Sequence, residues 1–448
     1  MAFSPEVPTL SIGIRTIQKL RIRILPFVFL LYVIAFLDRV NIGFAALTMN
    51  KELGITSQQF GLLTGIFFLG YLIFEVPSNI LLHKIGARIW IARILISWGI
   101  VAVLTGFVQT VHQLYLARFL LGLAEAGYGP GIVLYLTYWF RRQEQAQAIA
   151  VFLTGVPVAS LVGAPLSGLI LDHVHWLGLS SWRWLLILEG SPAVVGGVLT
   201  YFLLPNRPAE AKFLNEEEKH WISSELLREK RQKLAKHRVA AIQVFTNGRV
   251  WHLISIGFAF FIGSATINFW IPQLVKSLLP GRSNAAIGFV VMIPNLAAIF
   301  AMLLVSRSSD RKLERRYHAA IPVSVGGTAL LLLGATHSSF ISVALLSFAA
   351  AGVSSLYGPY FALPFEFLTG LSAASGIAFI NSFAHLGAFV GPSAVGWITQ
   401  KTGSLYSGLA LAGMSLFVCA ALVLLLPKQA ASLTDGSFPA SPSLISSE

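Results

Sequence analysis

Five ionisable side chains stand inside long apolar stretches of the sequence: Asp38, Arg39, Glu75, Arg118 and Glu125. A charged group at membrane depth is costly, so it needs a partner, a cavity or a function. Arg118 and Glu125 are seven residues apart and would lie on one helix face, about two turns from each other. Asp38 and Arg39 are adjacent and cannot face each other, so at least one of them must have a partner on another helix.

Arginines and carboxylates in such a setting can bind an organic anion and couple its passage to a proton. The planar guanidinium stays charged and binds a carboxylate through two parallel hydrogen bonds. A buried Asp or Glu can change protonation when its surroundings change. The alternative is a buried ion network that only fixes helix packing. For Glu75, which precedes Pro77 near the end of its apolar run, this structural role is the favoured interpretation.

The elements that must position these residues are membrane helices. The chain has 448 residues, of which 55% are hydrophobic and 11% are charged, against about 25% charged in soluble proteins. This composition excludes an ordinary soluble domain. The net charge of +13 would suggest nucleic-acid binding in a soluble domain, but the usual excess of Lys and Arg in cytoplasmic loops explains it here.

About twenty apolar residues span the hydrocarbon core of a bilayer, and the sequence contains twelve such runs. They lie near residues 24–48, 59–82, 89–109, 113–139, 146–171, 184–204, 250–274, 284–305, 318–336, 340–365, 373–399 and 404–427. The predicted fold class is therefore an all-α membrane protein with twelve transmembrane helices.

The longest polar segment, residues 205–249, divides the twelve runs into six and six. We expect a cytoplasmic N-terminal segment (1–23), a first bundle (24–204), a cytoplasmic linker (205–249) with a surface helix over 215–237, a second bundle (250–427) and a cytoplasmic tail (428–448). Most of the 32 basic residues fall on the side of the N-terminus, which predicts that both termini are cytoplasmic.

The two halves share features at nearly one offset. The basic loop Lys84–Arg88 corresponds to the loop Ser309–Arg316, and Gly163 and Gly168 correspond to Gly391 and Gly396. Such internal similarity indicates two six-helix pseudo-repeats. Bundles built from repeats of this kind are typical of transporters that rock two halves about a central site.

Other motifs carry little chemistry. The glycine-rich stretch Gly122–Gly131 lacks the Lys-Ser/Thr of a phosphate loop, so it predicts close helix packing and a kink at Pro130. His173 and His175 lack further metal ligands nearby, and Cys419 is the only cysteine. We find no motif for enzyme chemistry and expect no catalytic residue, metal or cofactor.

Polar and aromatic residues of several helices are candidates for contacts with a ligand. Asn381 and His385 are four residues apart on one helix face. The remaining candidates are Tyr71, Asn268 and Tyr360, with Tyr357 less favoured. Each of them could equally be a packing residue.

At these positions the sequence resembles the major facilitator superfamily and, within it, the anion:cation symporter family, with a likeness to permeases for tartrate and phthalate. The motifs that carry the resemblance run from the first helix to the eleventh: residues 36–43, 74–79, 86–88, Arg118 with 122–131, 182–190, 309–311 with 314–316, and 376–382.

The resemblance implies roles for individual residues. Asp38 and Glu125 look like proton carriers, Arg39 like the ligand of a substrate carboxylate, and Arg118 like a second arginine of the site. Tyr71 and Asn381 match residues of the family's binding site. The gating loop and its second copy fall on Lys84, Gly86 and Arg88, and on Asp310, Arg311, Glu314 and Arg315.

The second half departs more from the family pattern, for example at His385 and Phe361. The expected function is proton-coupled import of a small organic anion, a dicarboxylate or hydroxycarboxylate such as tartrate or phthalate. The alternatives are a permease for sugar acids or aromatic monocarboxylates, or, in another class, a membrane sensor that transports nothing. The resemblance also implies a functional monomer in the cell inner membrane. The expected partners are the anion, protons and the lipid bilayer, with no nucleic acid.

Overall fold

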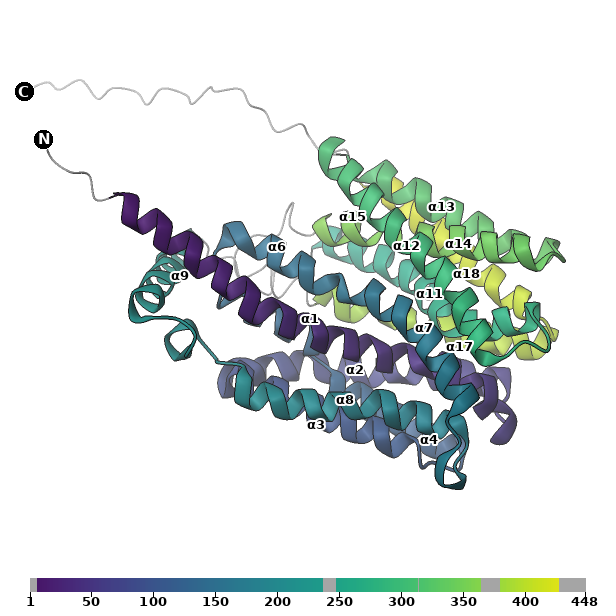
Figure 1. Ribbon diagram of the computed structural model, residues 1–448. Coiled ribbons are helices and arrows are strands. Elements are labelled where there is room, and N and C mark those ends of the chain that lie inside the picture. The colour runs from purple at the N-terminus through teal and green to yellow at the C-terminus, as the bar shows by residue number, and fades with distance from the viewer. Residues whose placement is uncertain (1–5, 237–246, 313, 364–378, 427–448) are drawn as a thin grey trace, which may run out of the picture.

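The computed structural model describes residues 6–236, 247–312, 314–363 and 379–426, and these ranges form helices without any strand (Figure 1). Within these ranges, eleven helical spans are long and apolar enough to cross a membrane. A further helical stretch, residues 379–384 followed by α17 (Leu386–Thr402), corresponds to the run predicted near 373–399, of which residues 373–378 lie outside the described ranges. The predicted all-α membrane fold is confirmed.

The first half is built from the helices up to α8. Their bounds are α1 (Glu6–Glu52), α2 (Ser57–Ile85), α3 (Ala87–Thr105), α4 (Val111–Glu125), α5 (Tyr128–Thr137), α6 (Arg142–Leu153), α7 (Gly155–His173) and α8 (Ser181–Leu203). The short 3₁₀ helix η1 (Trp176–Gly178) precedes α8, and η2 (Pro208–Glu210) follows it.

The second half follows α9 (Glu216–Lys236). Its helices are α11 (Gly248–Leu278), α12 (Asn284–Lys312), α13 (Arg316–Leu332), α14 (Ser339–Ser355), α15 (Tyr357–Ala362), α17 and α18 (Leu405–Leu424), with η3 (Leu333–Ala335) after α13. Residues 1–5, 237–246 of the predicted linker, and the predicted tail from 428 lie outside the described ranges.

Equivalent helices of the two halves pack in equivalent pairs. In the first half α2 packs on α4, α3 on α8 and α1 on α7. In the second half α12 packs on α14, α13 on α18 and α11 on α17. The fourth span is also interrupted in both halves, between α4 and α5 and between α14 and α15. This repeated arrangement is what a duplicated six-helix unit produces.

The interruption of the fourth span differs from the predicted kink at Pro130. The helix ends after Glu125, and Gly127 takes φ +83° before α5 begins. A left-handed backbone favours glycine because no Cβ is present. Pro130 lies in the first turn of α5, where a missing N–H costs nothing. The predicted kink is therefore displaced to Gly127.

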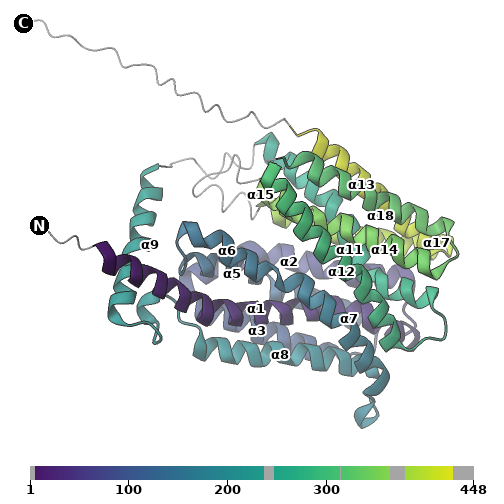
Figure 2. The same ribbon diagram turned by 45° about the horizontal axis from the view of Figure 1, so that its top comes forward.

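Helix α1 is longer than the apolar run near 24–48 that predicted it. Its extension packs against α9, as Figure 2 shows at the start of the chain. The carboxylate of Glu218 accepts hydrogen bonds from Arg15 (3.0 Å) and Lys19 (2.9 Å) of α1. The surface helix predicted over 215–237 is thus present, and it is held to the first half.

The two halves meet through α2 with α17, α7 with α12 and α1 with α11. Helix α1 begins and α18 ends at one end of the bundle, which we call the terminal end (Figure 1). We call the opposite end, where α1 ends and α2 begins, the loop end. At the loop end the backbones approach closely: a Cβ on Gly61 would lie 2.3 Å from the Pro392 carbonyl oxygen, and one on Gly288 2.3 Å from that of Ala164. The halves are closed against each other there.

Candidate functional site

The centre of the first half holds an ion pair between α1 and α4. The guanidinium of Arg39 donates a hydrogen bond to the Glu125 carboxylate. The Glu125 side chain is 2% exposed and that of Arg39 is 19% exposed. The guanidinium also lies over the rings of Phe36, Phe67 and Tyr71, at 4.9, 5.4 and 5.7 Å from the ring centroids. The structure therefore brings three of the predicted site residues together.

Arg118 reaches the same region from about two turns before Glu125 on α4. It is 2% exposed, and its guanidinium lies 5.1 Å from the centroid of Phe67. Within the described residues its Nε and Nη2 atoms are buried without a hydrogen-bond partner. Both guanidinium groups therefore contact the ring of Phe67. Arg118 thus has donors available for an acceptor that is not part of the chain.

Asp38 has partners other than its neighbour Arg39. It accepts hydrogen bonds from the indole N–H of Trp98 on α3 and from Asn41 Nδ2 at 3.0 Å. Asp38 is 3% exposed and Asn41 1%. The adjacent residues of α1 therefore face different surroundings: Arg39 faces α4, and Asp38 faces α3.

Glu189 on α8 is a buried carboxyl that the sequence analysis missed. It is 4% exposed, and its Oε1 accepts a hydrogen bond from Ser167 Oγ at 2.8 Å. The charge of Asp38 and the side-chain amide of Asn41 also act on the Glu189 carboxyl. Its position in the apolar run near 184–204 is the same signal that singled out Glu125.

Glu75 lies at the contact between the halves. It is 1% exposed and accepts a hydrogen bond from Ser382, in the helical stretch before α17. Its side chain therefore ties α2 to the second half. This contact agrees with the structural role that the sequence favours.

His385 is a residue of the second half that lies close to the first-half site. Its ring is stacked on Phe261 with 4.4 Å between centroids, and lies 6.0 Å from Phe68 and 5.8 Å from Tyr71. Its Nδ1 donates to the backbone carbonyl of Asn381 at 2.7 Å, which leaves Nε2 for another partner. Phe68 and Tyr71 belong to the first half, and Phe261 and His385 belong to the second, so these four rings form an aromatic wall that joins the two halves.

The remaining second-half candidates differ in their exposure and in their hydrogen-bond partners. Asn268 is exposed in the middle of α11, and its Nδ2 donates to the Ser264 carbonyl at 2.9 Å. Tyr360 is 1% exposed, and its hydroxyl donates to the Leu253 carbonyl at 3.1 Å within the second half. Tyr357, the less favoured tyrosine, is the one within electrostatic range of Arg39.

The predicted gating loops lie at the terminal end. Gly86 joins α2 and α3 with φ +100°, and the N–H of Arg88 donates to Asn206 Oδ1 at 3.0 Å. The side chain of Arg88 lies over the ring of Tyr201, and Lys84 is exposed. The first loop is therefore anchored to the start of the linker.

The second loop is held by its own hydrogen bonds. The Glu314 carboxylate accepts from the N–H of Tyr317 (2.8 Å) and pairs with the His318 imidazole (2.7 Å). Burial opposes ionisation of Glu314, but these bonds outweigh it and hold its pKa below the usual value. Arg311 is exposed and Arg315 precedes α13. The side chain of Asp310 lies outside the described part.

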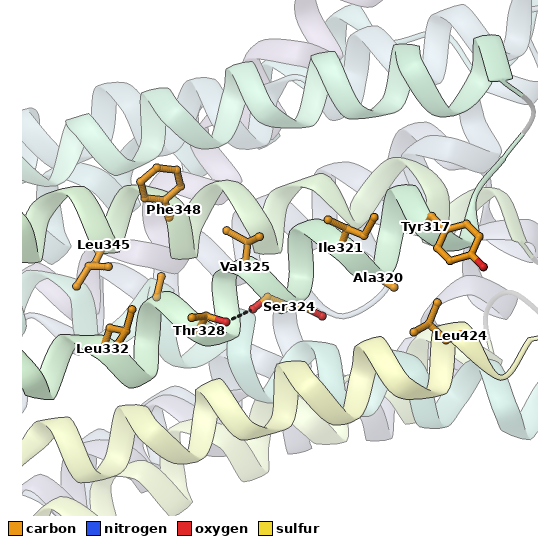
Figure 3. Close-up of a pocket in the computed structure, with 11 residues that line it drawn as sticks. Tyr317, Ala320, Ile321, Ser324, Val325, Thr328, Leu332, Leu345, Phe348 and Leu424 are labelled. Atoms are coloured by element: carbon orange, nitrogen blue, oxygen red, sulfur yellow. Dashed lines mark hydrogen bonds between the residues drawn. The ribbon is translucent and has the colours of Figure 1, made fainter.

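A groove of about 650 Å³ lies between α13, α14 and α18 (Figure 3). None of its eleven lining residues is charged, and Ile321 and Phe348 are 60% and 58% exposed. Such a face is expected to contact lipid. The charged group of the first half therefore remains the candidate site.

This chain is similar in sequence to known membrane transport proteins. The model of the family described as "Major Facilitator Superfamily" matches residues 28–392 and 281–446 of this chain. Two proteins of Agrobacterium vitis described as "Putative tartrate transporter" are each 43% identical to this chain. The alignments cover 94% and 93% of this chain and 93% and 95% of theirs. An "Inner membrane transport protein RhmT" of Escherichia coli is 35% identical over 84% of this chain and 87% of its own.

Solved structures show the same fold. The partially occluded inward-open xylose transporter XylE of E. coli superposes with a TM-score of 0.73 at 13% identity, covering 91% of this chain and 98% of its own. A bacterial homologue of the lysosomal transporter Spinster, in an inward-facing conformation, gives a TM-score of 0.70 at 17% identity, covering 90% and 94%.

Proposed function

Because this chain belongs to the major facilitator superfamily, and is a multi-pass membrane transporter rather than an enzyme, we propose that it imports a small dicarboxylate or hydroxycarboxylate, such as tartrate, together with protons. We further propose that it works as a monomer in the inner membrane, with both termini in the cytoplasm. The 43% identity to the two Agrobacterium proteins supports tartrate as the first substrate to test.

The observation that carries the proposal is the buried guanidinium of Arg118. Two of its nitrogens lack hydrogen-bond partners among the described residues, and a buried unsatisfied donor costs about 1–3 kcal/mol. A substrate carboxylate would satisfy both atoms through a bidentate pair. The cost is thereby recovered when the substrate is bound, which favours an anion at this place.

Arg39 would provide the second contact, under control of a proton. In this structure Glu125 occupies the Arg39 guanidinium. Protonation of Glu125 removes its charge and weakens the pair, which frees Arg39 for a second carboxylate. Substrate binding and proton uptake then favour each other, because each competes with the same ion pair. A dicarboxylate could contact both arginines at once.

Alternating access would be provided by the two halves rocking about this site. The glycine contacts described above close the loop end in this conformation. We propose that a conformation closed on this side is the one that exchanges substrate at the terminal end. With the termini in the cytoplasm, that exchange would be with the interior of the cell.

The test is transport by the purified protein in proteoliposomes. We expect counterflow of labelled tartrate and net uptake driven by an inward proton gradient. Competition by unlabelled phthalate, aldonates, hexuronates and benzoate then ranks the substrate classes. Absence of counterflow with every anion of this panel would contradict the proposal.

One observation favours aromatic monocarboxylates as a second candidate. The rings of Phe261, Phe68 and Tyr71 surround His385, and such a wall can stack an aromatic substrate. Stronger competition by benzoate than by tartrate would favour this candidate.

A further inference from the structure

The buried carboxyl of Glu189 takes no part in the mechanism proposed above. It belongs to a polar group between α1, α3, α7 and α8, which consists of Asp38, Asn41, Trp98, Ser167 and Glu189. All five side chains are buried, with exposures of 0–4%. The hydrogen bonds within this group constrain where its protons are.

Asp38 is satisfied as an anion. One of its oxygens accepts from the Trp98 indole and the other from Asn41 Nδ2. An indole N–H and an amide NH₂ can only donate, so both bonds require an accepting oxygen. Because Asn41 points its NH₂ at Asp38, its carbonyl oxygen Oδ1 points elsewhere.

Two oxygens of the group are left without a partner. They are Asn41 Oδ1 and Glu189 Oε2, both buried and both without a hydrogen-bond partner in the described part of the chain. Asn41 is among the groups that act on the Glu189 carboxyl, and its NH₂ already donates to Asp38. An ionised Glu189 could not bond to Asn41 Oδ1, since both atoms are acceptors. A protonated Glu189 could, because its O–H would donate to the amide oxygen and satisfy both atoms.

Charge leads to the same assignment. Asp38 is the charged neighbour that acts on Glu189, with Asn41 from the same helix and Ser167 from α7 as its polar neighbours. Trp98 from α3 donates to Asp38. No cation is among these partners of Glu189, whereas Arg118 and Arg39 act on Asp38 and favour its ionised form. Two buried like charges in one group are unfavourable. One proton on the pair removes this repulsion.

We propose that Glu189 is a third proton-coupling carboxyl, which holds a proton in this conformation through a hydrogen bond to Asn41 and releases it during the transport cycle. The coupling step rests on the proposed function, whereas the protonation itself does not. In this conformation the pair would consist of an ionised Asp38 and a protonated Glu189, linked by the amide of Asn41.

The protonation is tested by infrared spectroscopy of the reconstituted protein at neutral pH. A protonated carboxyl has a C=O absorption that a carboxylate lacks. We expect the spectrum of wild type minus Glu189→Gln to contain this band, and the spectrum of wild type minus Glu216→Gln to lack it. Glu216 is the matched control because its side chain is 89% exposed. We also expect Asn41→Leu to move the band to higher wavenumber, since the acid loses its acceptor. Absence of the band from the Glu189 difference would overturn the proposal.

The coupling is tested by the proton gradient at which net anion flux stops, from which the number of protons per anion follows. The variant Glu189→Gln keeps a donor for Asn41 but cannot bind or release a proton. We expect it to retain counterflow within about twofold of wild type and to lose one proton per anion. An unchanged ratio would overturn the coupling role. If the wild type itself shows no counterflow, the proposed function fails, and the infrared result still decides the protonation.

Discussion

The two halves of this transporter share one fold but differ in the chemistry of their interiors. The first half holds Asp38, Glu75, Arg118, Glu125 and Glu189 as buried ionisable residues. In the described part of the second half, the charged residues stand at helix ends, and the interior carries His385, Asn268 and tyrosines instead. Duplication therefore conserved the packing of the helices while the chemistry diverged. The difference suggests that the first half handles charge and protons, and that the second half shapes the space for the substrate.

The largest effect is expected for Arg118→Ala. Loss of a bidentate pair between charged groups should weaken anion binding at least about 100-fold, because hydrogen bonds to charged groups contribute about 1.5–3 kcal/mol each. The concentration dependence of counterflow measures it. Arg118→Lys, which keeps the charge without the fork, should be intermediate. Unchanged affinity in both variants would move the binding site away from the first half.

The next effect concerns the proton. We expect Glu125→Gln to keep counterflow while steady-state accumulation falls about tenfold per unit of pH gradient, since each coupled proton contributes about 1.4 kcal/mol per unit. Glu75→Gln is the matched control within the same half, because Glu75 bonds to Ser382 rather than to an arginine. Equal losses in both variants would show that buried charge in general, and not the pair with Arg39, couples the proton.

A smaller effect is expected in the second half. His385→Ala removes a ring stacked at 4.4 Å on Phe261, and aromatic pairs contribute about 0.5–1.5 kcal/mol. We expect an affinity change of about two- to tenfold and an altered order of competing anions, with the protons per anion unchanged. A changed proton ratio would contradict the division of labour between the halves.

The smallest effect is expected outside the membrane spans. Burial raises the pKa of Glu218, but its bonds to Lys19, the N–H of Asn215 and Arg15 outweigh this and lower it below 4.5. The stabilisation is thus present above the unfolded-state pKa and is lost as the pH falls through the folded-state value. Glu218→Gln should cost about 0.2–1 kcal/mol at pH 7, measured by thermal unfolding, and this cost should disappear as the pH falls through the folded-state pKa. Glu216→Gln, on the exposed face, should cost less.

Much of the site could be predicted from the sequence, because a charge in an apolar run is visible without any structure. Asp38, Arg39, Arg118 and Glu125 were found in this way, and Glu189 carried the same signal but was overlooked. The sequence analysis favours Tyr360 over Tyr357, but the sequence gives no physical ground for this order, because residues three apart lie on the same side of a helix. Only the rotation of the helix directs one towards Arg39 and the other towards Leu253.

The sequence by itself determined that the chain crosses a membrane about twelve times as two related halves, because spans are set by the local cost of exposing polar groups to lipid. It also showed which charges must be buried. Only the tertiary structure decided their partners: Arg39 with Glu125, Asp38 with Trp98 and Asn41, and Arg118 with two free donors. The physical reason is that pairing depends on how distant helices pack, and a periodic pattern along one helix contains no information about its neighbours.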